Sequence, residues 1–124
     1  SSPEITLPIA VITTPFFGAS AGDVETLVTD KIESRIESVS DIDTYTSTSR
    51  TGISNIVVTF EQNVDIDERV TRLKEAVDGA KFDLPDDGNE PQVTKIEFSA
   101  QPVLTISLAS DLPNYSFQKI VSNW

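Results

Sequence analysis

Residues 65–80 read DIDERVTRLKEAVDGA, and the fold is decided by the spacing of the apolar residues in this stretch. They recur at steps of four, three, four and three, at Ile66, Val70, Leu73, Val77 and Ala80. That spacing places them on one side of an α-helix. The acidic residues at the start lie where the helix dipole favours negative charge. The stretch therefore predicts a helix from Asp65 to about Phe82 with one buried face.

A second helix is predicted earlier in the chain, over about residues 21–38. Ser20 followed by Asp23 is typical of a helix N-cap and an acidic first turn. The predicted buried stripe consists of Val24, Leu27, Val28, Ile32, Ile36 and Val39. The acidic residues expected to face solvent are Glu25, Asp30, Glu33 and Glu37.

Four stretches rich in β-branched residues flank these helices, at 9–14, 42–49, 53–61 and 93–98. Arg50-Thr51-Gly52 supplies the turn of a hairpin between the second and third. The order is then βαββαβ, which predicts an α+β, ferredoxin-like sandwich with two helices on a four-stranded antiparallel sheet. A further strand over 103–109 and a truncated helix over 116–124 are expected to follow.

Composition excludes most kinds of chemistry. The 124 residues include 20 acidic and 9 basic side chains, for a net charge of -11, with no His, Cys or Met. Imidazole bases, thiolate nucleophiles and zinc, haem or iron–sulfur sites are therefore excluded. The negative charge disfavours nucleic acids and acidic membranes. We expect no enzyme, no cofactor and no catalytic residue, and no apolar run reaches the ~18 residues of a membrane span.

Two clusters of acidic residues have the oxygen atoms that a hard cation binds. One is Asp65, Asp67 and Glu68, and the other surrounds Gly88 in the segment 86–90. Neither matches the full spacing of a calcium loop. A helix N-terminus explains the first and a solvated turn the second, so no metal site is expected.

Two neighbouring aromatic residues, Phe16 and Phe17, follow the first predicted strand. Such a pair either packs under a helix or forms an exposed interaction point. The sequence leaves both alternatives open.

Five segments occur in an order that resembles the periplasmic porter region of resistance-nodulation-division (RND) efflux pumps, acriflavine-resistance type. They are the stretch 13–20 before a helix, the hairpin from 47–49 to 59–61, the helix start at 64–67, the Leu84-Pro85 stop and the stretch 99–104. The resemblance covers almost the whole chain. Phe17 departs from it, because a small residue usually precedes the glycine of the first loop. The lack of Met gives no support for copper or silver export.

The resemblance implies that residues 1–100 are the first porter subdomain and that 101–124 begin the second. It further implies a proton-driven exporter of small amphiphilic compounds, working as a homotrimer with a periplasmic adaptor and an outer-membrane channel. The chain would be a soluble periplasmic portion of a bacterial inner-membrane protein. The helix from Asp65 would line the trimer pore, with contacts from Asp65, Asp67, Arg69 and Arg72. Val103 and Ile106 would contribute to the wall of a substrate pocket.

The alternative is a free-standing ferredoxin-like domain that senses or binds a small molecule and dimerises edge to edge. The two hypotheses differ over residues 103–109, which a self-contained domain would pair in its own sheet. On either hypothesis, Asp in place of Val70 or Leu73 should unfold the chain. Changes at Arg69 or Arg72 are expected to leave it folded.

Overall fold

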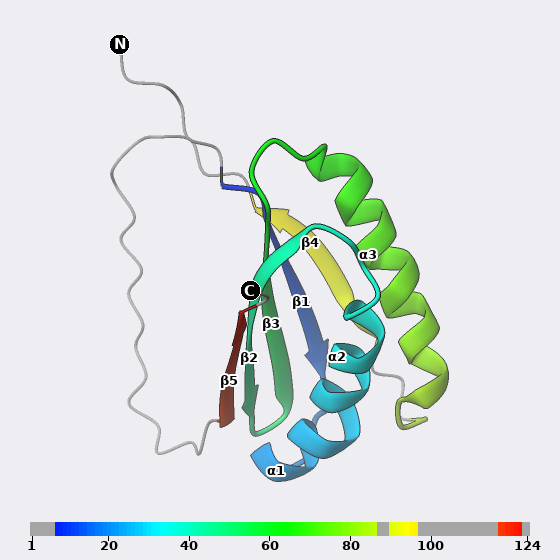
Figure 1. The fold of residues 1–124 in the computed structure, drawn as a ribbon. Coiled ribbons are helices and arrows are strands. Elements are labelled where there is room, and N and C mark those ends of the chain that lie inside the picture. Colours follow the sequence, from blue (N-terminus) through cyan, green and yellow to red (C-terminus); the bar gives the residue numbers. More distant parts are fainter. Residues whose placement is uncertain (1–6, 87–89, 97–116, 123–124) are drawn as a thin grey trace.

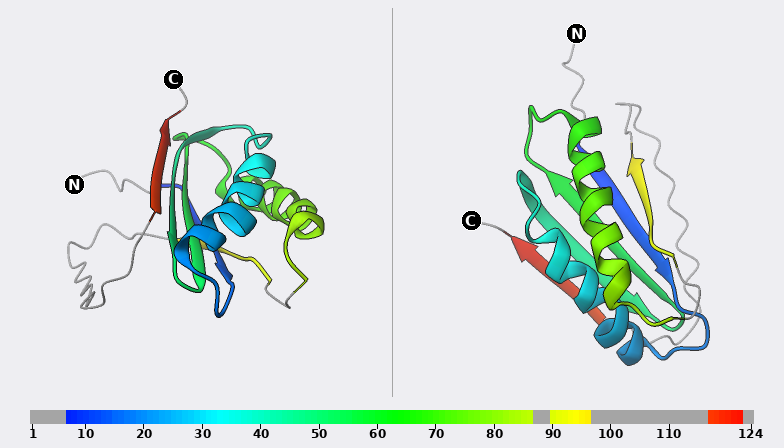
Figure 2. Two further views of the ribbon diagram at one scale, coloured as in Figure 1. Left: turned by 90° about the horizontal axis from the view of Figure 1, so that it is seen from below. Right: turned by 90° about the vertical axis from the view of Figure 1, so that its right-hand side faces the viewer.

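The computed structural model describes residues 7–86, 90–96 and 117–122, and in these ranges it has one sheet covered by helices on one face (Figures 1 and 2). The elements in order are β1 (Ile9–Pro15), α1 (Ala21–Val24), a π-helical segment η1 (Glu25–Thr29), α2 (Asp30–Ile36), β2 (Ile42–Arg50), β3 (Ile53–Phe60), α3 (Ile66–Ala80), a 3-10 turn η2 (Lys81–Asp83), β4 (Gln92–Ile96) and β5 (Phe117–Ser122). The strands lie in the order β4-β1-β3-β2-β5, and all neighbours are antiparallel. The predicted βαββαβ sandwich is confirmed.

The core lies between the sheet and the helices. Alternate residues of β1 and β3 point inward, and Ile12, Ile56 and Val58 are completely buried. Ile32 and Ile36 from α2 and Leu73 from α3 meet them from the helical side. Fully burying one such side chain stabilises the fold by about 1.5–3 kcal/mol.

Helix α3 follows its predicted bounds and orientation. It begins after Asp65, whose side chain accepts a hydrogen bond from the Glu68 backbone N–H. Four of the five predicted positions, Val70, Leu73, Val77 and Ala80, are buried, and Ile66 packs partly buried against the core. No helix in the described ranges is long and apolar enough to cross a membrane.

The first helix has the predicted extent, but its middle is not α-helical. In η1 the backbone N–H of Asp30 donates to the carbonyl of Glu25, five residues back. A π turn holds more residues than an α turn, so the face presented to the sheet shifts along the helix. Val24, Val28, Ile32 and Ile36 are buried as predicted, and Val39 packs partly buried. Leu27 is 40% exposed, so its prediction is wrong.

The loop after β1 is fixed to the β2–β3 turn by two backbone hydrogen bonds. Phe16 N–H donates to the Gly52 carbonyl at 2.8 Å, and Gly52 N–H donates to the Ala19 carbonyl at 3.0 Å. Gly52 has φ +78° and Gly18 has φ +87°, which favour glycine. Phe16 packs against the core, whereas Phe17 is 84% exposed, so the two aromatic residues have different roles.

The predicted helix over 116–124 is wrong, because residues 117–122 form the strand β5. It pairs with the edge of β2, with Thr44 opposite Ser122 and Ser49 opposite Phe117. An isolated helix of two turns is unstable in water, and the edge of β2 offers backbone groups that a strand can satisfy. The predicted strand at 103–109, with Val103 and Ile106, lies outside the described residues.

The buried stripe of α3 leads to a stability prediction. Leu73→Asp should unfold the chain, because it places an unpaired carboxylate among apolar side chains at a cost of about 4 kcal/mol or more. Arg72→Asp, at a half-exposed position on the same helix, is the matched control and should leave the chain folded. Circular dichroism during thermal unfolding measures both. Equal loss of structure in the two variants would contradict the assigned inner face.

Candidate functional site

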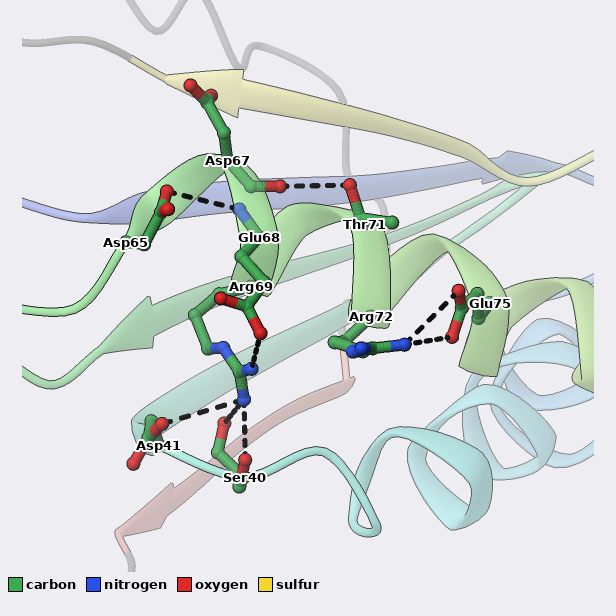
Figure 3. A network of polar contacts seen from close by, with 9 residues as sticks. All are labelled: Ser40, Asp41, Asp65, Asp67, Glu68, Arg69, Thr71, Arg72 and Glu75. Atoms are coloured by element: carbon green, nitrogen blue, oxygen red, sulfur yellow. Dashed lines mark hydrogen bonds and ion pairs between the residues drawn. The ribbon is translucent and has the colours of Figure 1, made fainter.

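The N-terminal turn of α3 is fixed by its acidic residues. Asp65 caps the helix, and Asp67 Oδ1 lies 2.8 Å from Lys95 Nζ on β4 (Figure 3 shows the helix side). Glu68 accepts a hydrogen bond from Arg69 Nη2 at 2.9 Å. Two of these three carboxylates are thus in ion pairs and the third caps the helix, as the helix-terminus explanation requires.

Arg69 connects α3 to the segment between α2 and β2. Its Nη1 donates to Ser40 Oγ at 2.5 Å and lies 3.5 Å from Asp41 Oδ2 (Figure 3). Asp41 adopts φ +68°, a left-handed conformation that turns the chain into β2. The Arg69 side chain is only 13% exposed. Its contacts are therefore within the chain, so a change at Arg69, which is predicted to leave the chain folded, should still lower its stability.

Arg72 lies on the outer side of α3, where its ion-pair partner belongs to the same helix. Its side chain is 54% exposed, and Nη1 is 3.2 Å from Glu75 Oε2, one turn further along (Figure 3). Arg69, Arg72 and Glu75 line one wall of an open cleft of about 390 Å³. The other wall is formed by residues 38–40. Of the four candidates, Arg72 and Asp67 have side chains that are more than half exposed.

A partly buried polar cluster lies between the first helix and the sheet, where the sequence predicted none. Carboxylate oxygens of Glu25, Asp30 and Glu33 lie within 4.8 Å of one another. Ser47 Oγ donates to Glu33 Oε2 at 2.7 Å, and Ser49 Oγ donates to Glu25 Oε2 at 2.5 Å. Glu33 is 7% exposed, so its prediction as a solvent-facing residue is wrong.

Hydroxyl groups continue this cluster across the sheet. Thr29 Oγ1 lies 2.7 Å from both Ser49 Oγ and Ser54 Oγ, and all three residues are buried. Three clustered carboxylates have the donor chemistry of a hard-cation site. Serine hydroxyls already donate hydrogen bonds to one oxygen each of Glu25 and Glu33. Packing between helix and sheet therefore also explains the arrangement.

The fold and the charged surfaces together define a class of protein. The described residues form a small, rigid α+β sandwich that presents a charged helix face. The sequence lacks imidazole and thiol groups, and the carboxylates of Asp65, Asp67 and Glu68 are used in a helix cap and in ion pairs. Such a unit is suited to contact other protein surfaces.

Comparison with known proteins identifies the family. The family model described as "AcrB/AcrD/AcrF family" matches residues 1–123. The chain belongs to this family of RND efflux transporters, and its sandwich is of the kind found in their porter region.

The relatives are much longer than this chain. It is 29% identical over 114 residues to the swarming motility protein SwrC of Bacillus subtilis, covering 92% of this chain and 11% of that protein. It is 26% identical over 110 residues to the multidrug resistance protein MdtC of Erwinia tasmaniensis, covering 88% and 11%. A crystal structure of a heavy metal efflux pump matches with a TM-score of 0.67 at 26% identity, covering 76% of this chain and 10% of that one. The chain thus spans about a tenth of the length of these relatives.

Arg69 and Arg72 should differ in their contribution to stability. Arg69→Ala removes charge-assisted hydrogen bonds from a largely buried side chain and should lower the free energy of unfolding by about 1–3 kcal/mol. Arg72→Ala removes an exposed pair and should change it by less than about 0.5 kcal/mol. Urea unfolding of both variants measures this difference. A loss at Arg72 as large as that at Arg69 would contradict the assignment.

The Ser47–Glu33 contact is testable by a double-mutant cycle. Ser47→Ala and Glu33→Gln should each destabilise the chain, and their effects should not add, with a coupling energy of about 1–2 kcal/mol. Ser38→Ala combined with Glu33→Gln is the control pair. Ser38 is exposed and donates to the Arg35 carbonyl instead. Additive effects in the Ser47 cycle would show that the buried hydrogen bond contributes nothing.

Proposed function

We propose that this chain is a non-catalytic part of the periplasmic porter region of a proton-driven multidrug efflux transporter. Residues 1–100 form the first porter subdomain and residues 101–124 begin the second. The chain contributes to the substrate path and, through α3, to the central pore of a homotrimer. The family match and the sandwich fold support this proposal.

One observation carries the pore assignment: α3 has two faces of opposite character. Its inner face is buried against the sheet at Val70, Leu73 and Val77. Its outer face carries both signs of charge, with Arg72 54% and Glu75 60% exposed. An outer face with both signs of charge allows opposite charges to pair between copies that meet around a threefold axis.

The contacts of α3 also explain how it would move. The Asp67–Lys95 ion pair holds its first turn to β4, and the contacts of Arg69 with Ser40 and Asp41 hold it from the other side. Apolar packing fixes the rest of the helix. The helix therefore moves only together with its sheet. Rigid bodies that slide or tilt against one another are one of the known ways to open and close a pathway.

The remaining parts of the proposal concern the whole transporter. It would lie in a bacterial inner membrane and carry small amphiphilic compounds. A periplasmic adaptor and an outer-membrane channel would complete the path. The net charge of -11 favours neither nucleic acids nor anionic lipid surfaces as partners of this part.

Cysteine cross-linking tests the pore assignment, because this chain has no cysteine of its own. Arg72→Cys in the whole polypeptide, in a background without other cysteines, should give covalent dimers with a short bifunctional maleimide, because each protomer offers one thiol. Lys31→Cys, exposed on α2, is the control and should stay monomeric. Cross-linking Arg72→Cys should also lower efflux of a fluorescent amphiphile from cells.

Two results would contradict the proposal. The first is Arg72→Cys remaining monomeric while the uncross-linked protein sediments as a trimer. The second is cross-linking at Lys31→Cys that equals cross-linking at Arg72→Cys, because then the contact would not be specific to α3.

A further inference from the structure

The outer side of α3 has two flanks, which adjoin different parts of the sandwich (Figure 3). On one flank Asp67 reaches toward β4, where its Oδ1 lies 2.8 Å from Lys95 Nζ. On the other flank Arg72 lines the open cleft opposite residues 38–40, which lie between α2 and β2. We call these two sides the β4 flank and the cleft flank of α3.

The helical repeat separates the two residues around the helix. Asp67 and Arg72 are five positions apart, which corresponds to a rotation of about 140° and a rise of about 7.5 Å in an α-helix. Glu75 lies between them around the helix, on the side opposite the buried Val77. The first turns of α3 therefore carry an acidic residue on the β4 flank and a basic residue on the cleft flank.

Both side chains are accessible and can make a second charged contact. Asp67 is 78% exposed and Arg72 is 54% exposed. Within the chain, Asp67 contacts Lys95 through Oδ1, and Arg72 contacts Glu75 through Nη1. A carboxylate has about four acceptor sites and a guanidinium has about five N–H donors, so one ion pair does not saturate either group.

We propose that Asp67 of one protomer and Arg72 of the next form an ion pair between neighbouring copies of α3, repeated at all three contacts of the trimer. This inference rests on the proposed function, which brings three copies of α3 to a common axis. In a ring with threefold symmetry each contact is heterologous, so one flank of a helix meets the other flank of its neighbour. An acidic flank and a basic flank on the same helix satisfy this requirement.

The two residues also agree in their level along the helix. Copies of α3 around the axis run parallel, so the backbone of Arg72 lies about 7.5 Å further along than Asp67 of the neighbour. Helical side chains lean toward the N-terminus of their own helix, and an arginine is long enough to span most of this distance. Parallel coiled coils use charged residues on their two flanks in the same way to set partner and orientation.

Two other carboxylates on the outer side of α3 fit Arg72 of a neighbour less well. Glu75 lies near the middle of the outer side, where a threefold axis would bring three like charges together, and its 3.2 Å contact with Arg72 of its own chain lowers that repulsion. Asp78 lies on the β4 flank but further along than Arg72, which leans away from that level. Asp78 is also 3.2 Å from Lys81 of its own helix.

Charge reversal in the whole polypeptide tests the ion pair. The variants are Arg72→Glu, Asp67→Arg and the double variant that carries both changes. The control double variant combines Arg72→Glu with Asp78→Arg, because Asp78 is 67% exposed on the same flank as Asp67. Circular dichroism of each purified polypeptide first establishes that it is folded. Native mass spectrometry in detergent solution then measures the fraction of trimer as the protein concentration is lowered.

Each single reversal places like charges opposite one another at all three contacts and should lower the trimer association constant by about tenfold or more. The double variant with Asp67→Arg forms the same pair with its signs exchanged, so it should associate at least about tenfold more tightly than either single variant. Because this double variant and Asp67→Arg alone both lose the contact with Lys95, their difference reports the contact between copies. The control double variant should show no such recovery.

Two results would overturn the inference. They are a double variant that associates no more tightly than the single variants, and single variants that associate as tightly as the parent. Cross-linking at Arg72→Cys tests the proposed function separately. Covalent dimers at that position without recovery in the double variant would overturn the ion pair alone. A parent polypeptide that is monomeric at every concentration would overturn both the proposed function and the ion pair.

Discussion

The burial of two helical stripes against one face of a single antiparallel sheet is the constraint on which the rest of the structure depends. Ile12, Ile56 and Val58 supply the sheet side, and Ile32, Leu73 and Val77 supply the helix side. Because the strands alternate and the helices are amphipathic, this packing uses half of each element. The other half of α3, its outer side, is left for contacts with other surfaces, and the proposed pore assignment concerns this side.

Most of the fold follows from the sequence, because its periodicities are simple. Helix α3 and the β2–β3 hairpin were predicted with bounds that differ by one or two residues from those observed. The extent of the first helix was predicted correctly, but its buried face was predicted only in part. The spacing rule assumes 3.6 residues per turn along the whole helix. The π-helical segment at 25–29 breaks that assumption and brings Glu33 to the sheet. The inward positions of β2 after Tyr45 are Ser47 and Ser49, and these small hydroxyl residues were a signal that polar groups would face them.

The assignment of the candidate site residues stays a prediction. The choice of Asp65, Asp67, Arg69 and Arg72 came from a resemblance, which places a helix at a pore without distinguishing inner contacts from outer ones. In the structure Asp65 caps α3, while Asp67 and Arg69 hold it to its own sandwich. The side chains of Arg72 and Asp67 are both more than half exposed. Tertiary contacts such as Arg69 to Ser40, 29 residues away, leave no local pattern in a sequence.

The end of the described chain shows how the open edge of a sheet competes with a weak local preference. Residues 117–122 were predicted as helical from a short run, yet they pair with β2. An edge strand with unpaired backbone groups binds a β-branched segment more readily than two turns of helix persist alone.

A cryo-electron microscopy structure of the whole polypeptide is the most direct measurement for this view of the molecule. The expected result is a trimer in which three copies of α3 face the central axis with Arg72 at the contact. A structure in which α3 faces solvent away from the axis would contradict it.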